Sequence, residues 1–407
     1  MLRFHLIFLA LIVSALAAPR TFTLDSIPAR VRTSNLELAA ARMRIAEAQG
    51  RLTHAGRLGN PELEFDYARD TAAPREHTLS VAITQRLPLT SRLRHARTAS
   101  RAQLDAAAAE VDDLETHLIA QAESAAIKLL AIKGQRAIRG KQLANSRERA
   151  AFLTRGADRG EVSTIDAAQM ELETGMLEAE LLQLDVEEVS LRGQLRPLLG
   201  LADTSPLELA GDLGNPKPLP PTGTVTSAHI KAATFTAAAA QASLAEQRAS
   251  RFEDVGLSVL YERERFEDEP VGLLTEQRLG LRVSIPLPIW NTNLGRIQEA
   301  EATAERTRLD ADALRLQTGG EAAAARAEMA ALAKLLDNLD TRLLPKASDL
   351  EERLQQSYAA GQSPLIEVLR ARDRRLQLQR QRLDALRDHH LAQVRHAATL
   401  GKAGFIK

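Results

Sequence analysis

The sequence contains no cysteine among its 407 residues. Disulfides, thiolate metal ligands and catalytic thiols are therefore excluded together, and so is a lipid-carrying cysteine anchor. Aromatic residues make up only 3% of the chain, so a core built mainly from Phe, Tyr and Trp is excluded as well. The apolar residues that remain are chiefly Ala, Leu and Val, which suit long, closely packed helices.

An excess of charge of one sign is also missing, because 53 basic residues balance 53 acidic ones. No basic stripe stands out, which leaves nucleic-acid binding without an electrostatic basis. The phosphate loop, the nucleophile elbow and the HExxH zinc motif are absent too. We therefore expect neither an enzyme nor a bound cofactor.

The first 17 residues have the pattern of a secretory signal peptide. Arg3 supplies the positive start, an apolar run covers residues 6–13, and Ala15-Leu16-Ala17 forms a cleavage site. A membrane anchor is the alternative, but so short a run cannot cross a hydrocarbon core of about 30 Å. No later stretch of 18 apolar residues occurs, so any membrane insertion must use strands.

The mature chain contains an internal duplication. Three sets of residues recur in the same order at offsets of 194 to 201. Leu63, Phe65, Tyr67 and Arg69 recur as Leu257, Val259, Tyr261 and Arg263, and Pro88 recurs as Pro288. Gly160 with Ile165-Asp166 recurs as Gly361 with Ile366-Glu367. We therefore predict one repeat over 18–202 and another over 224–407. A Pro/Gly-rich linker, 203–223, separates them.

Each repeat predicts the same order of elements: helix, strand, loop, strand, long helix, tight turn and second long helix. In the first repeat the helix is expected over 25–55 and the strands over 62–69 and 77–87, with a polar loop at 70–76. In the second repeat the corresponding elements are a helix over 228–252, strands over 256–266 and 278–285, and a loop at 267–277.

All four predicted strands alternate apolar and polar residues. Leu63, Phe65 and Tyr67, for example, are interleaved with Glu62, Glu64 and Asp66. Such strands are typical of a transmembrane barrel with a wet lumen, or of a soluble β-sandwich. In a bilayer, four strands cannot close a barrel and would leave backbone groups unpaired in lipid, so the chain must oligomerise if it spans. Two, three and four copies all satisfy this requirement.

The long helices carry heptads of leucine. Leu177, Leu184, Leu191 and Leu198 are seven residues apart, and Leu369, Leu376 and Leu383 repeat the pattern, which predicts coiled-coil packing. A proline-free helix is expected from residue 91 to 155. A second long helix is expected from 292 to 360, interrupted at Gly319-Gly320 and Pro345. The returning helices are expected to start near Thr164, with Ser163 and Asp166 as a capping box, and at Pro364 in a first-turn position.

Three passages carry a resemblance to a known family: 55–63, 284–295 and 357–369. Through them the chain resembles the TolC-type outer-membrane factors of bacterial tripartite efflux systems, and within these the heavy-metal (cobalt–zinc–cadmium) branch. The resemblance implies a mainly α fold with a transmembrane β part, in which three chains form a 12-stranded barrel and a periplasmic tunnel of helices. It also implies a periplasmic adaptor and an inner-membrane RND-type pump as partners.

The same resemblance assigns the two tight turns to the inner tip of the tunnel, where the adaptor docks. The residues concerned are Arg159, Gly160, Ser163, Ala360, Gly361 and Ser363. Two acidic residues ring the constriction in TolC-type proteins, and Glu367 matches the first, whereas Arg370 stands in place of the second. A Glu367–Arg370 pair would instead hold the tip closed. Asp166 is the corresponding residue of the first repeat, and a helix-start carboxylate is the plainer explanation for Glu367.

The function expected is therefore a passive exit duct for heavy-metal cations. The same duct for drugs or for type I protein export is one alternative, and a soluble periplasmic coiled-coil scaffold is another. Metal ligation by His389, His390 and His396, near the end of the last helix, is not expected, because adjacent residues point to different sides of a helix.

Overall fold

The computed structural model describes residues 20–73, 75–202, 207–216, 218–219, 226–402 and 404. The predicted signal peptide therefore lies outside the described residues, as does part of the predicted linker. The chain divides into two compact units. The helical unit comprises Met1–Ala39, Leu114–Val225 and Gly319–Lys407, and the sheet unit comprises Ala40–Asp113 and Thr226–Thr318. Each sequence repeat contributes to both units.

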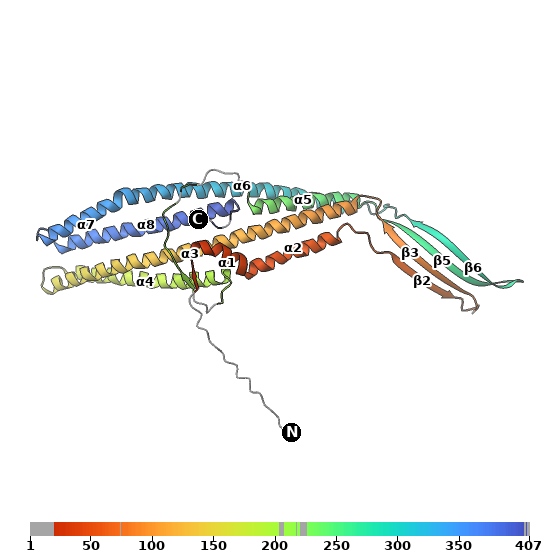
Figure 1. Cartoon of the computed structure of the whole chain (residues 1–407), viewed down its shortest axis with the longest axis horizontal. Coiled ribbons are helices and arrows are strands. Elements are labelled where there is room, and N and C mark those ends of the chain that lie inside the picture. The colour runs from red at the N-terminus through yellow and green to blue at the C-terminus, as the bar shows by residue number, and fades with distance from the viewer. Residues whose placement is uncertain are drawn as a thin grey trace, which may run out of the picture. The chain divides into compact units, whose positions relative to one another are not determined.

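The helical unit contains long helices that run alongside one another, together with a small parallel strand pair (Figure 1). Its helices are α1 (Ile27–Ser34), α4 (Thr164–Leu198), α7 (Leu344–Ala359), α8 (Leu365–Thr399), and the parts of α3 (Arg92–Asp158) and α6 (Leu294–Asn338) that fall within it. Strands β1 (Arg20–Phe22) and β4 (Leu207–Leu209) form the pair. No helix in the described part of the chain is apolar over enough residues to cross a bilayer.

Glycine ends all four of the hairpin helices in the same way. Gly160, Gly200, Gly361 and Gly401 have φ angles between 63° and 75°. At each, the glycine N–H and the next N–H donate back to carbonyls three and five residues earlier, as in Glu161 N–H to the Gly156 oxygen at 2.9 Å. This arrangement satisfies the last carbonyls of the helix and requires a left-handed residue. The two pairs of glycines are 201 residues apart, which agrees with the duplication.

Ion pairs join α3 to α4 along their length. Arg136 contacts Asp185 at 2.5 Å, Arg147 contacts Glu178 at 2.7 Å, and Arg149 contacts Glu173 at 3.1 Å. Helix α4 carries eight acidic and two basic residues, whereas α8, its counterpart in the second repeat, carries eight arginines and four acidic residues. The two copies have therefore diverged in charge. Surface pairs contribute about 0–1 kcal/mol each, so this ladder specifies register more than stability.

The leucine heptads lie on the inner side of their helices. Leu191 and Leu195 of α4 and Leu369 and Leu376 of α8 are buried. A close approach accompanies them, since a Cβ added to Gly134 of α3 would lie 2.8 Å from the side chain of Leu383. These leucines therefore pack inward, and coiled-coil packing of the helices stays a prediction.

Three expectations about the helices were wrong. The first helix is broken at Asn35, which has extended backbone and separates α1 from α2 (Leu36–His54). Gly319-Gly320 does not interrupt α6; the irregularity is a π-helical turn, η2 (Leu339–Leu343), just before Pro345. Pro364 is the N-cap of α8 rather than a first-turn residue.

The sheet unit contains one antiparallel four-stranded sheet in the order β2-β3-β5-β6. Its strands are β2 (Glu62–Arg69), β3 (His77–Leu87), β5 (Val255–Asp268) and β6 (Gly272–Ser284). The first hairpin matches the prediction at both strands. In the second hairpin the loop at 267–277 was wrong, because β6 begins at Gly272 and only residues 269–271 connect the strands. The preceding helix, α5 (Ala228–Ala249), ends three residues earlier than expected.

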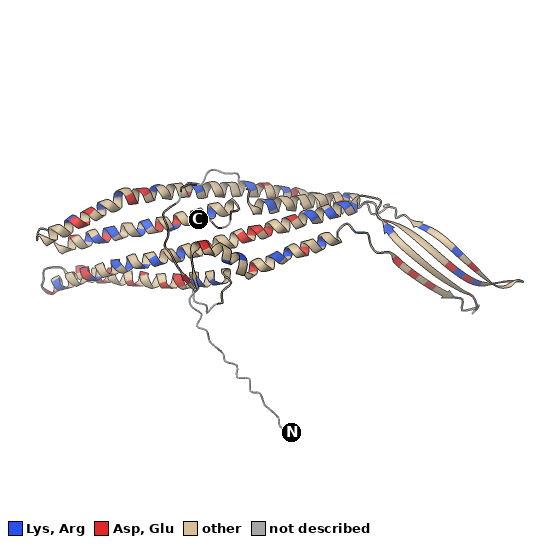
Figure 2. Cartoon of the chain, in the orientation of Figure 1, with Lys and Arg blue, Asp and Glu red and all other residues tan. Residues whose placement is uncertain are grey.

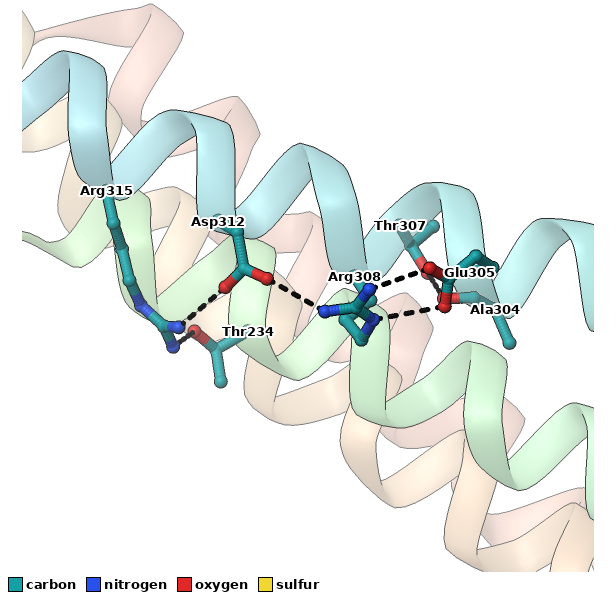
Figure 3. Close-up of polar contacts among 7 residues, drawn as sticks. All are labelled: Thr234, Ala304, Glu305, Thr307, Arg308, Asp312 and Arg315. Carbon is teal, nitrogen blue, oxygen red and sulfur yellow. Dashed lines mark hydrogen bonds and ion pairs between the residues drawn. The ribbon is translucent and has the colours of Figure 1, made fainter.

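Helix α6 carries a chain of polar contacts within the sheet unit (Figure 3). Arg308 donates to Glu305 at 2.7 Å and to Asp312 at 3.1 Å, and Asp312 accepts from Arg315. Arg315 also donates to the Thr234 hydroxyl of α5 at 3.2 Å. The hydrogen bond from Arg308 lowers the pKa of Glu305, so this carboxylate stays ionised. These contacts link Arg308, Asp312 and Arg315 along an alanine-rich helix and join it to α5.

Candidate functional site

The first candidate site is the apolar face of the sheet. The strand register aligns Leu63, Ile83, Val259 and Leu281 in one row, and Phe65, Val81, Tyr261 and Leu279 in the next. These side chains are uncovered, since Phe65 is 66% exposed, Leu281 77% and Leu279 80%. An apolar patch of this kind on one chain requires a partner surface or lipid.

The opposite face of the same sheet is polar and mainly acidic. Figure 2 shows the acidic and basic positions along the strands. Seven carboxylates share it: Glu62, Glu64, Asp66, Glu262, Glu264, Asp268 and Glu276. Three arginines lie on the same face: Arg86, Arg278 and Arg282. Arg278 contacts Glu264 at 3.2 Å and Glu276 at 2.8 Å. The face therefore keeps a net negative charge, which attracts cations from water.

Both outer strands of the sheet have an open edge. Within the described residues, β2 pairs with β3 alone and β6 pairs with β5 alone. Their outer N–H and C=O groups have no strand beside them in this chain. In a bilayer such edges are tolerated only when another strand pairs with them.

Apolar residues continue past the strands on the side where the helices begin. Leu89 is 70% exposed, Leu287 70%, Ile289 66% and Trp290 96%. Trp290 follows β6 by six residues and is the one tryptophan of the chain. An uncovered tryptophan at the end of an apolar band is typical of a membrane–water interface.

The second candidate site is the pair of tight turns, which lie at one end of the helical unit (Figure 1). Gly160 and Gly361 are the left-handed residues that reverse the chain, as predicted. Ser163 caps α4 by accepting from the Ile165 N–H at 3.1 Å. Ser363 donates to the Leu354 carbonyl at 3.4 Å. Arg159 and Ala360 flank the glycines on exposed backbone.

Glu367 and Arg370 do form an ion pair, at 3.1 Å within one turn of α8. Their side chains are 45% and 65% exposed, so this pair by itself contributes little to stability. It does neutralise the carboxylate on its own chain. Asp166 lies in the first turn of α4, where a carboxylate favours the helix dipole.

The three histidines of α8 are buried rather than arranged for a metal. His389, His390 and His396 are at most 5% exposed. His390 Nε2 lies 2.9 Å from the Gly214 carbonyl, whereas neither ring nitrogen of His389 has a hydrogen-bond partner among the described residues. No group of three or more His, Asp or Glu side chains in the described part of the chain could hold a metal ion.

The burial of His389 and His396 makes folding stability depend on pH. Desolvation, with a smaller effect of His390, lowers the pKa of His389 below its ordinary 6.5. Desolvation, Arg326 and Lys402 lower the pKa of His396 in the same way. The unfolded chain therefore takes up protons below pH 6.5 before the folded chain does. Folding stability should be fully present above pH 6.5 and should fall as the pH drops below it.

We predict that His389→Leu stabilises the protein and weakens this pH dependence. The substitution removes a desolvated imidazole that has no hydrogen bond to lose, so the expected gain is about 1 kcal/mol. Thermal unfolding followed by circular dichroism at several pH values measures both effects. His390→Leu is the matched control, and it should destabilise because it removes the contact with Gly214. Equal effects of the two substitutions would contradict the prediction.

Comparison with known proteins adds to this geometry. Residues 224–402 match the family model described as "Outer membrane efflux protein". No curated protein sequence matches the chain. Among solved structures, the outer-membrane channel OprN superposes with a TM-score of 0.77 at 20% identity, over 94% of this chain and 90% of that one. CusC gives 0.74 at 16% identity, over 93% and 92%. The MtrE outer membrane channel of Neisseria gonorrhoeae, solved in its open state, gives 0.73 at 17% identity, over 93% and 89%.

These likenesses confirm the predicted TolC-like fold. The likeness spans both repeats, whereas the family match falls on the second repeat alone. By that match, residues 224–402 are similar to the outer membrane efflux protein family.

Proposed function

We propose that the chain is one subunit of a passive exit duct in the outer membrane of a Gram-negative bacterium, with its helical unit in the periplasm. The observation that carries this proposal is the sheet itself. One face is apolar and uncovered, the other is polar, and both edges are open. Lipid accepts the first face, a water-filled lumen accepts the second, and sister chains pair with the edges.

A homotrimer meets these needs, with three four-stranded sheets closing a 12-stranded barrel. The two tight turns would then gather at the periplasmic tip, where Arg159, Gly160, Ser163, Ala360, Gly361 and Ser363 would meet a periplasmic adaptor. The adaptor would join the duct to an inner-membrane RND-type pump. In this arrangement the Glu367–Arg370 pair, and Asp166 at the corresponding position of the first repeat, would line the constriction.

Heavy-metal cations are the cargo we propose. Two observations support a cationic cargo: the branch resemblance of the three sequence passages, and the excess of carboxylates over arginines on the polar face. A drug or a protein as cargo would need no such excess. Deleting the gene and comparing survival on metal salts and on drugs tests the choice, and sensitivity to drugs alone would reject it.

We predict that the pore prefers cations over anions. Each polar face carries a net negative charge, and the three faces of a trimer would share one lumen. The reversal potential of the purified protein in a planar bilayer, under a KCl gradient, measures this preference. Replacing Glu64, Asp66 and Glu262 by their amides should lower the preference by about half or more, in proportion to the charge removed.

Arg282→Gln is the control of opposite sign for that experiment. It removes a positive charge from the same face, so the preference for cations should rise. A pore that prefers anions, or one that is indifferent to all four substitutions, would contradict a lumen lined by this face.

Fractionation tests the duct itself. Detergent-solubilised trimers from the outer membrane, with stepwise ion conductance in a planar bilayer, are the expected result. A soluble periplasmic monomer would favour the coiled-coil scaffold instead and would reject the proposal.

A further inference from the structure

The four connections between strands and helices in the sheet unit share a feature that the duct does not need. These connections, here called the junction segments, are residues 55–61, 88–97, 250–254 and 285–297. Together they contain six arginines and two acidic residues. The arginines are Arg57, Arg92, Arg94, Arg97, Arg251 and Arg296, and the acidic residues are Glu253 and Asp254. The two turns at the other end of the sheet, 70–76 and 267–271, have the opposite balance, with one arginine and five acidic residues.

The arginines of the junction segments are largely without partners. Arg92 forms a forked ion pair with Asp254. Arg57, Arg94, Arg251 and Arg296 are exposed, and none forms an ion pair with another described residue. Each of the four junction segments thus supplies at least one free guanidinium, and residues 88–97 supply a second in Arg97.

Two of these arginines also sit where a helix disfavours positive charge. Arg94 is in the first turn of α3 and Arg296 in the first turn of α6, and neither first turn contains an acidic residue. The positive end of the helix dipole raises the cost of a cation at this position. The two arginines occupy equivalent places in the two repeats, so the arrangement occurs twice. A bound anion would accept hydrogen bonds from the free guanidinium groups and would be attracted to the positive helix N-termini.

The apolar residues next to the junction segments indicate where that anion lies. Leu89, Leu287, Ile289 and Trp290 are uncovered and continue the apolar face of the sheet toward the helices. Side chains in this order, apolar and then arginine, match the order of acyl chains and phosphates in a bilayer leaflet. We propose that the junction segments bind the headgroups of anionic phospholipids in the leaflet nearest the helices. This inference rests on the proposed insertion of the sheet into the membrane.

Trp290 allows a direct test because it is the one tryptophan and lies in a junction segment. The protein is reconstituted in phosphatidylcholine vesicles that contain brominated phosphatidylglycerol or brominated phosphatidylcholine, and quenching of Trp290 gives the relative affinity of the two lipids. We expect phosphatidylglycerol to be preferred about fivefold or more, since each basic group near an anionic surface contributes roughly that factor.

A variant with Arg57, Arg94, Arg251 and Arg296 replaced by Gln should lose this preference. The matched control replaces four exposed arginines outside the junction segments, Arg44, Arg155, Arg353 and Arg374, and should keep it. Equal quenching by the two lipids in the unchanged protein, or an unchanged preference in the first variant, would overturn the inference. So would loss of the preference on adding inorganic phosphate, because the surface would then bind phosphate itself rather than a lipid.

The failure of the proposed function would look different. If the sheet does not enter the bilayer, neither brominated lipid quenches Trp290 and alkaline carbonate extracts the protein from the vesicles. Insertion with equal quenching by both lipids would reject lipid selection alone.

Discussion

Val81→Arg is expected to abolish insertion into the membrane, whereas Ser80→Arg is expected to be tolerated. The two residues are neighbours in β3 and lie on opposite faces of the sheet. Val81 is aligned with Phe65 and Tyr261 on the apolar face. An arginine at this depth in lipid costs about 2–4 kcal/mol in one chain, and a symmetric ring of chains bears that cost in every subunit.

Ser80 is aligned with Asp66 and Glu262 on the polar face. An arginine there meets carboxylates and water, so assembly should be close to that of the unchanged protein. The measurements are the amount of trimer in the outer-membrane fraction and the conductance of the purified protein. If Val81→Arg assembles normally while Ser80→Arg does not, the assignment of the two faces is reversed. If both assemble normally, the sheet lies in water.

This comparison separates the membrane duct from a soluble sandwich, which the strand sequences alone do not. Alternation of apolar and polar residues predicts a two-faced sheet in either case. The structure adds the exposure of the apolar face, since Phe65 and Leu281 remain uncovered by the chain's own helices. In a sandwich the same side chains would be packed against a second layer.

The first hairpin was predictable because its alternation is clean and polar residues mark its turn. The second hairpin was misjudged for a physical reason. Residues 272–277 are Gly-Leu-Leu-Thr-Glu-Gln, which do not alternate, yet they pair along their length with β5. Backbone hydrogen bonds hold a strand wherever it has a neighbour, so beyond an apolar band a strand continues without a side-chain signal.

The break at Asn35 depends on a contact that is distant in sequence. The Asn35 carboxamide oxygen accepts from the Leu38 N–H at 2.8 Å, and its amide donates to the Leu198 carbonyl at 3.1 Å. A capping asparagine is recognisable in a sequence, but its second partner lies 163 residues away. The burial of His389 is likewise set by packing between helices. Of the candidate site, the sequence therefore predicted the turn glycines and the strand faces, and it did not predict the buried state of the histidines.

The second large expected effect concerns Gly200, next to the contact between Asn35 and the end of α4. Gly200 follows α4 with φ at +63°, and a Cβ added to it would lie 2.1 Å from the Ser34 carbonyl oxygen, at the end of α1. This neighbour is backbone and cannot rotate away. The Arg30 side chain donates to the Leu199 carbonyl at 3.0 Å, and the Asn35 side chain donates to the Leu198 carbonyl. Two hydrogen bonds therefore join the end of α1 to the end of α4.

We expect Gly200→Ala to destabilise the protein by about 2–4 kcal/mol, as the sum of left-handed strain and overpacking. Gly160→Ala is the matched control, because Gly160 has the same left-handed backbone but no atom within 4 Å of its added Cβ. It should cost about 1 kcal/mol, from strain alone. Thermal unfolding of the purified protein, followed by circular dichroism at 222 nm, compares the two. Similar losses for both would mean that the α1 end moves freely away from α4, and the contacts of Arg30 and Asn35 with the end of α4 would then contribute little to stability.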